Sequence, residues 1–398
     1  MGALWRARGM EQVISDALRW SPCVSVIGLR QTGKSSLVRH FAQNYLTFDD
    51  DSLVGRLERE GSAFLEAPPF PIGIDEVQKY PKFFNVLKKS IDGNRRTGRF
   101  LITGSIKFTN KREIRESLTG RAVTFELLPL SLAECHKASA SIFLQKLFSC
   151  SLPDVEGILS NLSARFSMSD LKEYAHKGGM PGICFRRDEK VREHLYNQHL
   201  DTLLGRDIHE VATIKLATKQ LRELFRNIIQ QQGFSFNLSQ MARLVGVSVP
   251  TVKKIIQAFE TLFLIRQNGD CLYTEDLGIA AFVAPISTRP EKLVLQSVLH
   301  SELRSQISLA SEPSLSMTSW ESRGGASVPF LVELARTSRR IAITFDNEHY
   351  ASEKSLKSLG AYAKLHHDNE IILIALHCGN EFYMAGAGVY CVPLKSVF

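Results

Sequence analysis

The residues best suited to chemistry lie near the start of the chain, where the spacing G-x-x-x-x-G-K-[ST] of a phosphate-binding P-loop occurs over residues 28–35. The apolar run 24–27 before it predicts a buried strand, and residues 36–41 after it predict the start of a helix. In that setting, backbone N–H groups and a helix N-terminus face the phosphates. The pattern indicates a nucleotide site whose contacts are Gly28, Arg30, Gln31, Thr32, Gly33, Lys34, Ser35 and Ser36.

Two adjacent acids, Asp75 and Glu76, follow a second apolar run at residues 70–74. In a P-loop site, Lys34 would reach the β- and γ-phosphates and Ser35 would ligate Mg²⁺. Asp75 would then hold the metal and Glu76 would orient the attacking water, whereas a P-loop kinase does not need a second acid beside the first. The alternative interpretation of the two adjacent acids is that they only mark the solvated end of a strand. This arrangement predicts ATP hydrolysis, with ATP and Mg²⁺ as cofactors.

Residues 45–49 predict another strand, and a further strand, residues 99–105, ends in two hydroxyl residues, Thr103 and Ser105. In the additional-strand class of P-loop proteins, such a strand lies between the P-loop strand and the acid strand, and a polar residue at its tip touches the γ-phosphate. Ser105 or Thr103 would have this sensor role, unless the hydroxyl only caps the strand. Strands alternating with helices predict an α/β fold with a parallel sheet and the ligand at the strand C-termini.

Arg121 precedes the next predicted strand, residues 122–127, and we expect it on the nucleotide side of the sheet. An arginine finger there would stabilise charge on the transferring phosphoryl group. Action in trans would require a ring or a nucleotide-bridged dimer. The alternative is a surface arginine that caps a carbonyl.

These motifs resemble those of a family of bacterial and archaeal AAA-type ATPases. The resemblance rests on the strings I-G-L-R-Q-T-G-K-S, I-D-E-V-Q-K-Y-P, L-I-T-G-S, S-L-T-G-R and L-P-L-S-L-A-E, in that order over residues 22–135. It implies an ATPase core at 1–135, a helical lid or connector at 136–228, a winged helix at 229–272 and a restriction-endonuclease-like α/β domain at 273–398. It also favours the finger role for Arg121 and a homo-oligomeric assembly.

Two further segments, residues 178–181 and 204–208, are similar to the family's G-G-x-P and R-D-I segments. The family's usual Glu after the Pro is Gly182 here. The roles of Arg206 and Asp207 do not follow from the sequence, although an internal ion pair that fixes a helix against the nucleotide domain would suit them.

A helix-turn-helix pattern covers residues 238–259, with Ser239 as an expected cap and Gly246 in the turn. In the second helix, Val252, Ile255, Ile256 and Phe259 are expected to face inward. The outward residues could enter a DNA major groove, or the unit could instead couple domains or dock a partner protein. They are Thr251, Lys253, Lys254 and Gln257.

The C-terminal part departs from the metal-binding pattern of the nuclease-like domain that the resemblance implies. Family members often have V-D-F and E-x-K on consecutive strands, where acids bind Mg²⁺. Here these positions are Val328-Pro329-Phe330 and Thr344-Phe345-Asp346, so we expect a non-catalytic domain. Strands are expected at 329–334, 340–345, 371–376 and 388–392, helices at 291–303 and 352–366, and a loose connection or short strand at 305–319.

The composition of the 398-residue chain is that of an ordinary soluble protein, with 44% hydrophobic and 23% charged residues. No apolar run reaches the roughly 18 residues of a membrane span. Seven scattered cysteines without C-x-x-C favour a reducing cytoplasm over a disulfide framework or a zinc site. The net charge of +8 permits an anionic partner such as DNA. We therefore expect an ATP-hydrolysing switch or motor coupled to DNA, or a signalling ATPase whose nucleotide state controls protein assembly.

Overall fold

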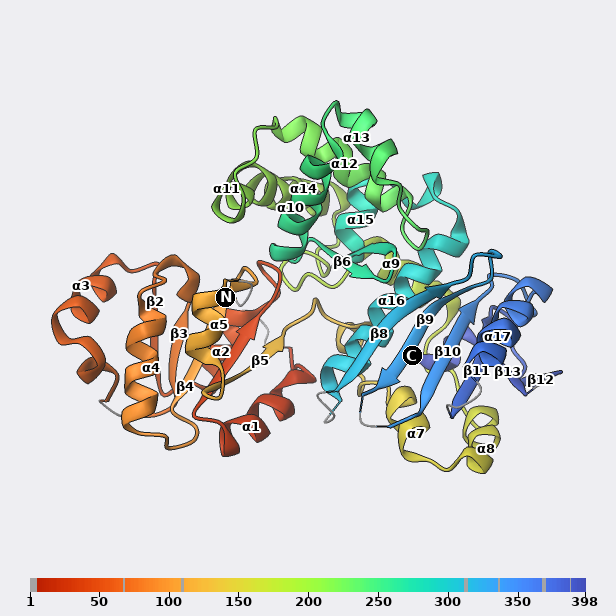
Figure 1. The fold of residues 1–398 in the computed structure, drawn as a ribbon, viewed down its shortest axis with the longest axis horizontal. Coiled ribbons are helices and arrows are strands. Elements are labelled where there is room, and N and C mark those ends of the chain that lie inside the picture. The colour runs from red at the N-terminus through yellow and green to blue at the C-terminus, as the bar shows by residue number, and fades with distance from the viewer. Residues whose placement is uncertain are drawn as a thin grey trace.

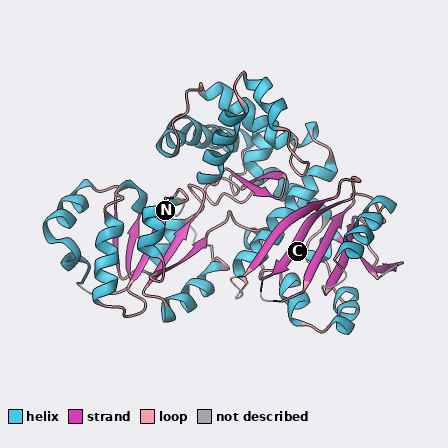
Figure 2. Ribbon diagram, in the orientation of Figure 1, coloured by secondary structure: helices cyan, strands magenta, loops and turns pink. Residues whose placement is uncertain are grey.

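The computed structural model describes residues 6–66, 69–108, 111–310, 314–335, 337–366, 370–386 and 388–398. Figure 1 shows an N-terminal α/β lobe in red and orange, a helical lobe in green and a C-terminal α/β lobe in blue. The two large sheets lie in the outer lobes, with helices packed around them (Figure 2). Within the described part, none of the helices combines the length and apolar character needed to cross a bilayer. All seven cysteines are free thiols.

The N-terminal sheet is parallel, with the strand order β2-β3-β4-β1-β5. The strand that precedes Ser105 therefore lies between the P-loop strand and the acid strand, which confirms the additional-strand prediction. Because parallel strands end at a common edge, β1, β4 and β3 bring their C-terminal residues together. The strands are β1 (Cys23–Ile27), β2 (Asn44–Thr47), β3 (Ile72–Asp75), β4 (Phe100–Gly104) and β5 (Ala122–Glu126).

Helices cover both faces of this sheet, so successive side chains of β1 are buried on alternate sides. The side chains of Val24 and Val26 lie on the face covered by α1 and α2, while those of Cys23 and Ile27 lie on the face covered by the other helices. The helices of this lobe are α1 (Met10–Trp20), α2 (Lys34–Phe41), α3 (Asp51–Glu60), α4 (Phe83–Gly93), α5 (Arg112–Leu118) and α6 (Leu132–Cys135).

The helical lobe contains the predicted helix-turn-helix. Gly246 has a φ of +70° and ends the first helix, as the turn requires. The N-cap is Asn237, which accepts a hydrogen bond from Gln240 N (3.0 Å), so the expectation for Ser239 is wrong. The elements are α9 (Met168–Lys177), α10 (Glu189–Thr202), a π-helical turn (Leu203–Asp207), α11 (Ile208–Val211), α12 (Thr218–Gln230), α13 (Leu238–Val245), α14 (Val249–Thr261), β6 (Ile265–Asn268), β7 (Cys271–Thr274) and α15 (Leu277–Val283).

The segment expected to form the lid is divided between two lobes. Helices α7 (Phe143–Ser149) and α8 (Val155–Ser160) pack into the same hydrophobic cluster as the C-terminal sheet, as Figure 1 also shows. Arg339, next to β10, donates a hydrogen bond to Leu147 O (3.2 Å). Only the later part, including α10 and the π-helical turn, approaches the P-loop.

The C-terminal sheet is mixed, with the strand order β12-β13-β11-β10-β9-β8. Residues 305–319 are more regular than predicted, because α16 continues to Leu309 and β8 begins at Leu315. The other expected strands and helices are present, with shifts of one or two residues at their starts and of up to six at the end of α16. The elements are α16 (Glu291–Leu309), β8 (Leu315–Glu321), β9 (Ser327–Leu334), β10 (Arg340–Phe345), α17 (Glu353–Leu365), β11 (Ile371–His377), β12 (Tyr383–Ala385) and β13 (Val389–Pro393).

Candidate nucleotide site

The loop between β1 and α2 has the tight backbone geometry that the P-loop pattern requires. Gly28 has a φ of +151°, and a Cβ there would lie 2.4 Å from Leu127 O of the neighbouring strand connection. Gly33 has a φ of +98° and Gln31 a φ of +68°, both in the left-handed region. α2 begins at Lys34, so its free N–H groups face the concave side of the loop. Gln31 and Ser36 are exposed, while Thr32 and Lys34 are buried.

Arg8 fastens the loop from outside the motif, a role that sequence reasoning missed. Its guanidinium donates to Thr32 O (2.8 Å) and Leu128 O (2.6 Å) and pairs with Glu134 (3.0 Å). These bonds join the P-loop to the connection after β5. No local signal marks this arginine, because the partners of its guanidinium are all distant in the chain.

Lys34 points into the loop, where its ammonium donates to Gly28 O (2.9 Å) and Leu29 O (2.7 Å). Burial lowers the pKa of Lys34 to about 8, although the charges of Glu76 and Asp75 oppose this shift and Arg30 adds to it. The lysine and both acids therefore share one electrostatic site.

Asp75, at the end of β3, accepts hydrogen bonds from Tyr45 Oη (2.6 Å) and from the Thr103 hydroxyl, and the side chain of Ser35 is close enough to lower its pKa as well. Burial opposes ionisation, but these bonds outweigh it, so the pKa of Asp75 lies below its usual value. A serine hydroxyl beside an ionised carboxylate is the oxygen donor set that Mg²⁺ prefers. The residues present therefore fit a magnesium ion held by Ser35 and Asp75.

Glu76 begins the next turn in the left-handed region, with a φ of +54°, which few non-glycine residues adopt. This conformation turns its carboxylate towards β4, where Ser105 Oγ donates to Glu76 Oε2 (3.0 Å). Gln78 bonds both Glu76 and Ser105 Oγ. Of the two predicted sensor residues, Ser105 thus contacts the second acid and Thr103 the first.

The helical lobe contacts the same loop through Asp207, which ends the π-helical turn. Asp207 Oδ2 lies 3.0 Å from Arg30 Nε, and Asp207 Oδ1 lies 2.9 Å from Arg206 Nε. The internal ion pair expected for Arg206 and Asp207 is therefore present, and it includes an arginine of the P-loop.

Arg121 lies at the opposite edge of the sheet, so the expectation that it sits on the nucleotide side is wrong. β5 is parallel to β1, with Ala122 beside Cys23, and the P-loop follows the far end of β1. Six residue steps of about 3.3 Å each, across the five residues of β5, separate Arg121 from the level of Gly28. The guanidinium is held by two hydrogen bonds of 2.7 Å to Asp92. This geometry excludes action in cis and leaves action in trans as a prediction.

The outward face of α14 is as expected. Lys253, Lys254 and Gln257 are exposed and Thr251 is half-buried, while the four predicted inward residues are buried. Lys254 Nζ donates to Thr213 O (2.7 Å), so one of the two lysines has a partner within the lobe.

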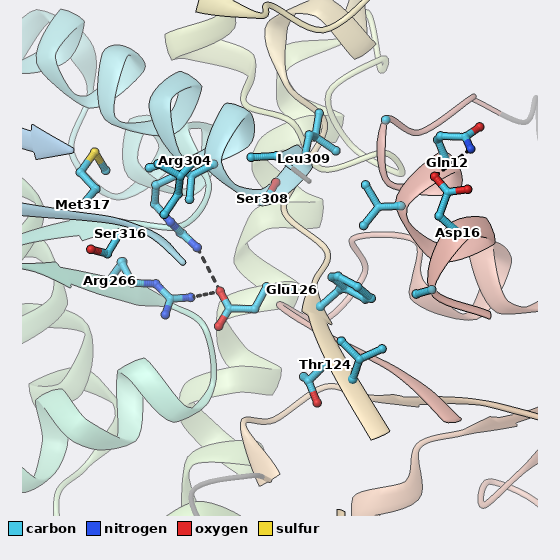
Figure 3. A pocket seen from close by; sticks show the side chains of 18 of the residues that line it. Gln12, Asp16, Thr124, Glu126, Arg266, Arg304, Ser308, Leu309, Ser316 and Met317 are labelled. Carbon is cyan, nitrogen blue, oxygen red and sulfur yellow. Dashed lines mark hydrogen bonds and ion pairs between the residues drawn. The ribbon is translucent and has the colours of Figure 1, made fainter. Parts of the chain in front are cut away.

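A charged cluster joins the three lobes at the end of β5 (Figure 3). Glu126 accepts hydrogen bonds from Arg266 of β6 (2.5 Å) and Arg304 of α16 (3.0 Å), and Arg304 also bonds Glu275 (2.6 Å). Burial raises the pKa of Glu126, but Arg266, Arg304 and Lys107 outweigh it, so the pKa lies below its usual value. A cavity of about 840 Å³ opens beside this cluster, between β5 and α16, and not at the P-loop. Sequence reasoning missed the cluster.

The two positions of the C-terminal sheet where the resemblance implied nuclease acids carry no set of metal-binding side chains. Pro329 lies in β9, and the hydroxyl of Thr344 in β10 is buried without a hydrogen-bond partner. The carboxylate of Asp346 forms an ion pair with Lys292 (3.0 Å) and accepts a hydrogen bond from Ser352 N at the start of α17 (2.9 Å). Within the described ranges, no group of three or more His, Cys, Asp or Glu side chains could hold a metal ion.

Two family models match this chain. Residues 21–136 match an AAA domain, and residues 168–269 match a domain of unknown function (DUF8612). Among curated proteins, an uncharacterized protein of Mycobacterium tuberculosis is 24% identical over 255 residues, which cover 63% of this chain and 50% of the relative. An uncharacterized protein of Methanocaldococcus jannaschii is 23% identical over 263 residues, covering 62% and 52%. The chain thus spans about half the length of the curated relatives it matches.

Among solved structures, a Walker-type ATPase of Pyrococcus abyssi shares 12% identity over 69% of this chain and 94% of its own, with a TM-score of 0.39. DnaA of Aquifex aeolicus bound to AMPPCP shares 15% identity over 63% and 86%, with a TM-score of 0.26. The strand order, the P-loop and the matching family model together show that the N-terminal lobe is an AAA-type domain with a P-loop ATPase fold.

Proposed function

We propose that this protein is a Mg²⁺-dependent ATP hydrolase of the AAA type that acts as a nucleotide-driven switch or motor. The observation that carries the proposal is the arrangement at the carboxyl edge of the sheet, where Asp75 lies within interaction range of Ser35 and Ser105 donates a hydrogen bond to Glu76. Asp75 and Ser35 would hold Mg²⁺, which neutralises phosphate charge when bound. Lys34 would bind the β- and γ-phosphates.

Glu76 is suited to orient the attacking water, because Ser105 and Gln78 hold its carboxylate at the tip of β4. The remaining P-loop residues would bind phosphate through backbone N–H groups, and Ser105 would also sense the γ-phosphate. Arg121 would complete the site of a neighbouring copy in a homo-oligomer, since it lies too far from its own P-loop.

Phosphate release at saturating ATP tests the hydrolase proposal. We expect turnover with Mg²⁺ and its loss when EDTA removes the metal, because Ser35 and Asp75 then have no cation to place against the phosphates. Restoring Mg²⁺ in excess of EDTA should restore the rate. A rate that is unaffected by EDTA would contradict the metal site.

We further propose that residues 229–272 form a winged helix that couples the ATPase to DNA. The support is the exposed polar face of α14 and the net charge of +8. Residues 273–398 would form a non-catalytic nuclease-like domain, supported by the order helix, three strands, helix, strand from α16 to β11 and by the occupied carboxylate of Asp346.

Lys253→Glu should weaken binding of duplex DNA and lower the slope of log affinity against log salt by about one. The reason is that one phosphate contact and its released counterion are lost. Fluorescence anisotropy at several salt concentrations measures both effects, alongside DNA-stimulated ATP turnover. Lys219→Glu makes the same charge change at an exposed position of α12 and is the matched control.

The second candidate is a signalling ATPase whose nucleotide state controls protein assembly. It is favoured by the β6–β7 hairpin, which packs against the C-terminal lobe instead of projecting into solvent. Asn268 donates to Pro329 O (2.9 Å) and Ser319 Oγ donates to Asn268 O (3.2 Å). If the wild type shows neither salt-sensitive DNA binding nor DNA-stimulated turnover, the DNA proposal fails and this second candidate gains.

A further inference from the structure

The π-helical turn 203–207 ends in an acid that is buried against the phosphate loop. The Asp207 side chain is 4% exposed, and each of its carboxylate oxygens faces an arginine, Arg30 on one side and Arg206 on the other. A π-helical turn between two α-helices is an uncommon backbone form that often marks functional sites. The proposed ATPase chemistry does not use Asp207.

Arg30 is the third residue of the P-loop, and its charge reaches the phosphate-binding lysine. It contributes to the low pKa of Lys34, so the two cations lie within electrostatic range of each other. The ion pair with Asp207 does not give Arg30 Nε a well-aligned hydrogen bond. Although Nε lies 3.0 Å from the carboxylate, this buried atom has no aligned hydrogen bond. An acceptor with better geometry would therefore compete well for the guanidinium.

Arg206 and His199 complete the surroundings of the carboxylate. Arg206 lies within electrostatic range of Glu76, the acid proposed to orient the attacking water. His199 is buried with neither ring nitrogen bonded, and burial together with Arg30 lowers its pKa to about 4. His199 is thus neutral near pH 7, and Asp207 is the anion that faces Arg30.

We propose that Asp207 and the γ-phosphate of ATP compete for Arg30, so that a triphosphate, but not a diphosphate, releases the turn 203–207 from the phosphate loop. The inference rests on the nucleotide site proposed above. It makes Arg30 a residue that distinguishes ATP from ADP, and it makes Asp207 the element that couples this distinction to the lid.

Release follows from the cost of a buried, uncompensated carboxylate. Once Arg30 turns to phosphate, Asp207 loses one of its two partners in a site that is almost closed to water. The turn must then move so that water can reach the acid. A cavity of about 430 Å³ lies between Arg30, Gln31 and α10, which leaves room for the guanidinium and the helix to shift.

The test compares the affinities of a slowly hydrolysed ATP analogue and of ADP, measured by titration calorimetry. In Asp207→Asn the competitor has lost its charge, so we expect the ratio of analogue affinity to ADP affinity to rise about tenfold. In Arg30→Gln the ratio should fall about tenfold, because the γ-phosphate loses its partner. Glu193→Gln is the matched control, since this acid of α10 is exposed and does not line the cavity beside Arg30.

Hydrogen exchange of the wild-type protein gives a second readout that needs no variant. Amides of residues 203–211 should exchange faster with the analogue than with ADP, and in Asp207→Asn the exchange should be fast with both. The competition would be overturned if the affinity ratio is unchanged in both variants, or if residues 203–211 exchange at the same rate with the analogue and with ADP. Either outcome would leave the hydrolase proposal intact. A wild-type protein that binds no nucleotide would overturn both.

Discussion

Glu76→Gln should leave the affinity for ATP near that of the wild type and slow its hydrolysis by about 10²–10⁴-fold. The amide keeps the shape of the side chain and can still accept the hydrogen bond from Ser105, which is 3.0 Å long in the structure. It cannot, however, accept a proton from the attacking water. The loss should therefore appear in turnover and not in binding.

Phosphate release and equilibrium binding of a slowly hydrolysed analogue separate the two effects. Glu60→Gln is the control, because Glu60 is an exposed acid at the end of α3 in the same lobe. Lys34→Ala, in contrast to Glu76→Gln, should lose the binding of nucleotide itself. Normal turnover in Glu76→Gln would exclude Glu76 as the water-orienting acid.

Arg121→Ala should retain nucleotide binding and lose about 10³–10⁵-fold in hydrolysis, the range measured for arginine fingers. The guanidinium lies at the edge of the sheet opposite to the P-loop, so the residue can act only on the site of a neighbouring copy. Mixing Arg121→Ala with Glu76→Gln should then restore activity, because a shared site can combine the intact acid of one chain with the intact arginine of the other.

The ion pair of Arg121 with Asp92 supplies the matched control. Asp92→Asn weakens the same two hydrogen bonds but keeps the guanidinium, so it should hydrolyse ATP at nearly the wild-type rate. If Asp92→Asn is as slow as Arg121→Ala, the pair is structural and the finger role fails. The mass of the protein with the ATP analogue should show an oligomer, whereas a persistent monomer would contradict action in trans.

The positions of Asp75, Glu76 and Ser105 could be predicted because each follows a strand of a parallel sheet. The patterns of 24–27, 70–74 and 99–105 indicate buried strands, and the additional-strand order then places Asp75, Glu76 and Ser105 at the edge where the P-loop begins. The same reasoning was wrong for Arg121, because a residue before a parallel strand lies at the opposite edge from one after it.

Polar residues in helices were harder to interpret. Helix α16 was predicted to end at residue 303, yet it continues to Leu309 because tertiary contacts satisfy its later polar side chains. Gln306, for example, accepts from Leu144 N (3.0 Å) and donates to Val397 O (3.1 Å). The local pattern of apolar residues cannot predict these hydrogen bonds, since the partners come from distant segments.

By itself, the sequence determined the phosphate loop and the two acids after β3, because local spacing sets their chemistry and strand alternation sets their place. Only the tertiary structure decided what restrains that site. The contacts of Arg8 with the Thr32 carbonyl, of Asp207 with Arg30 and of Glu126 with its arginines each join segments that are far apart in the chain. A charged side chain finds such a partner only through the packing of whole lobes, which leaves no periodic trace in the sequence.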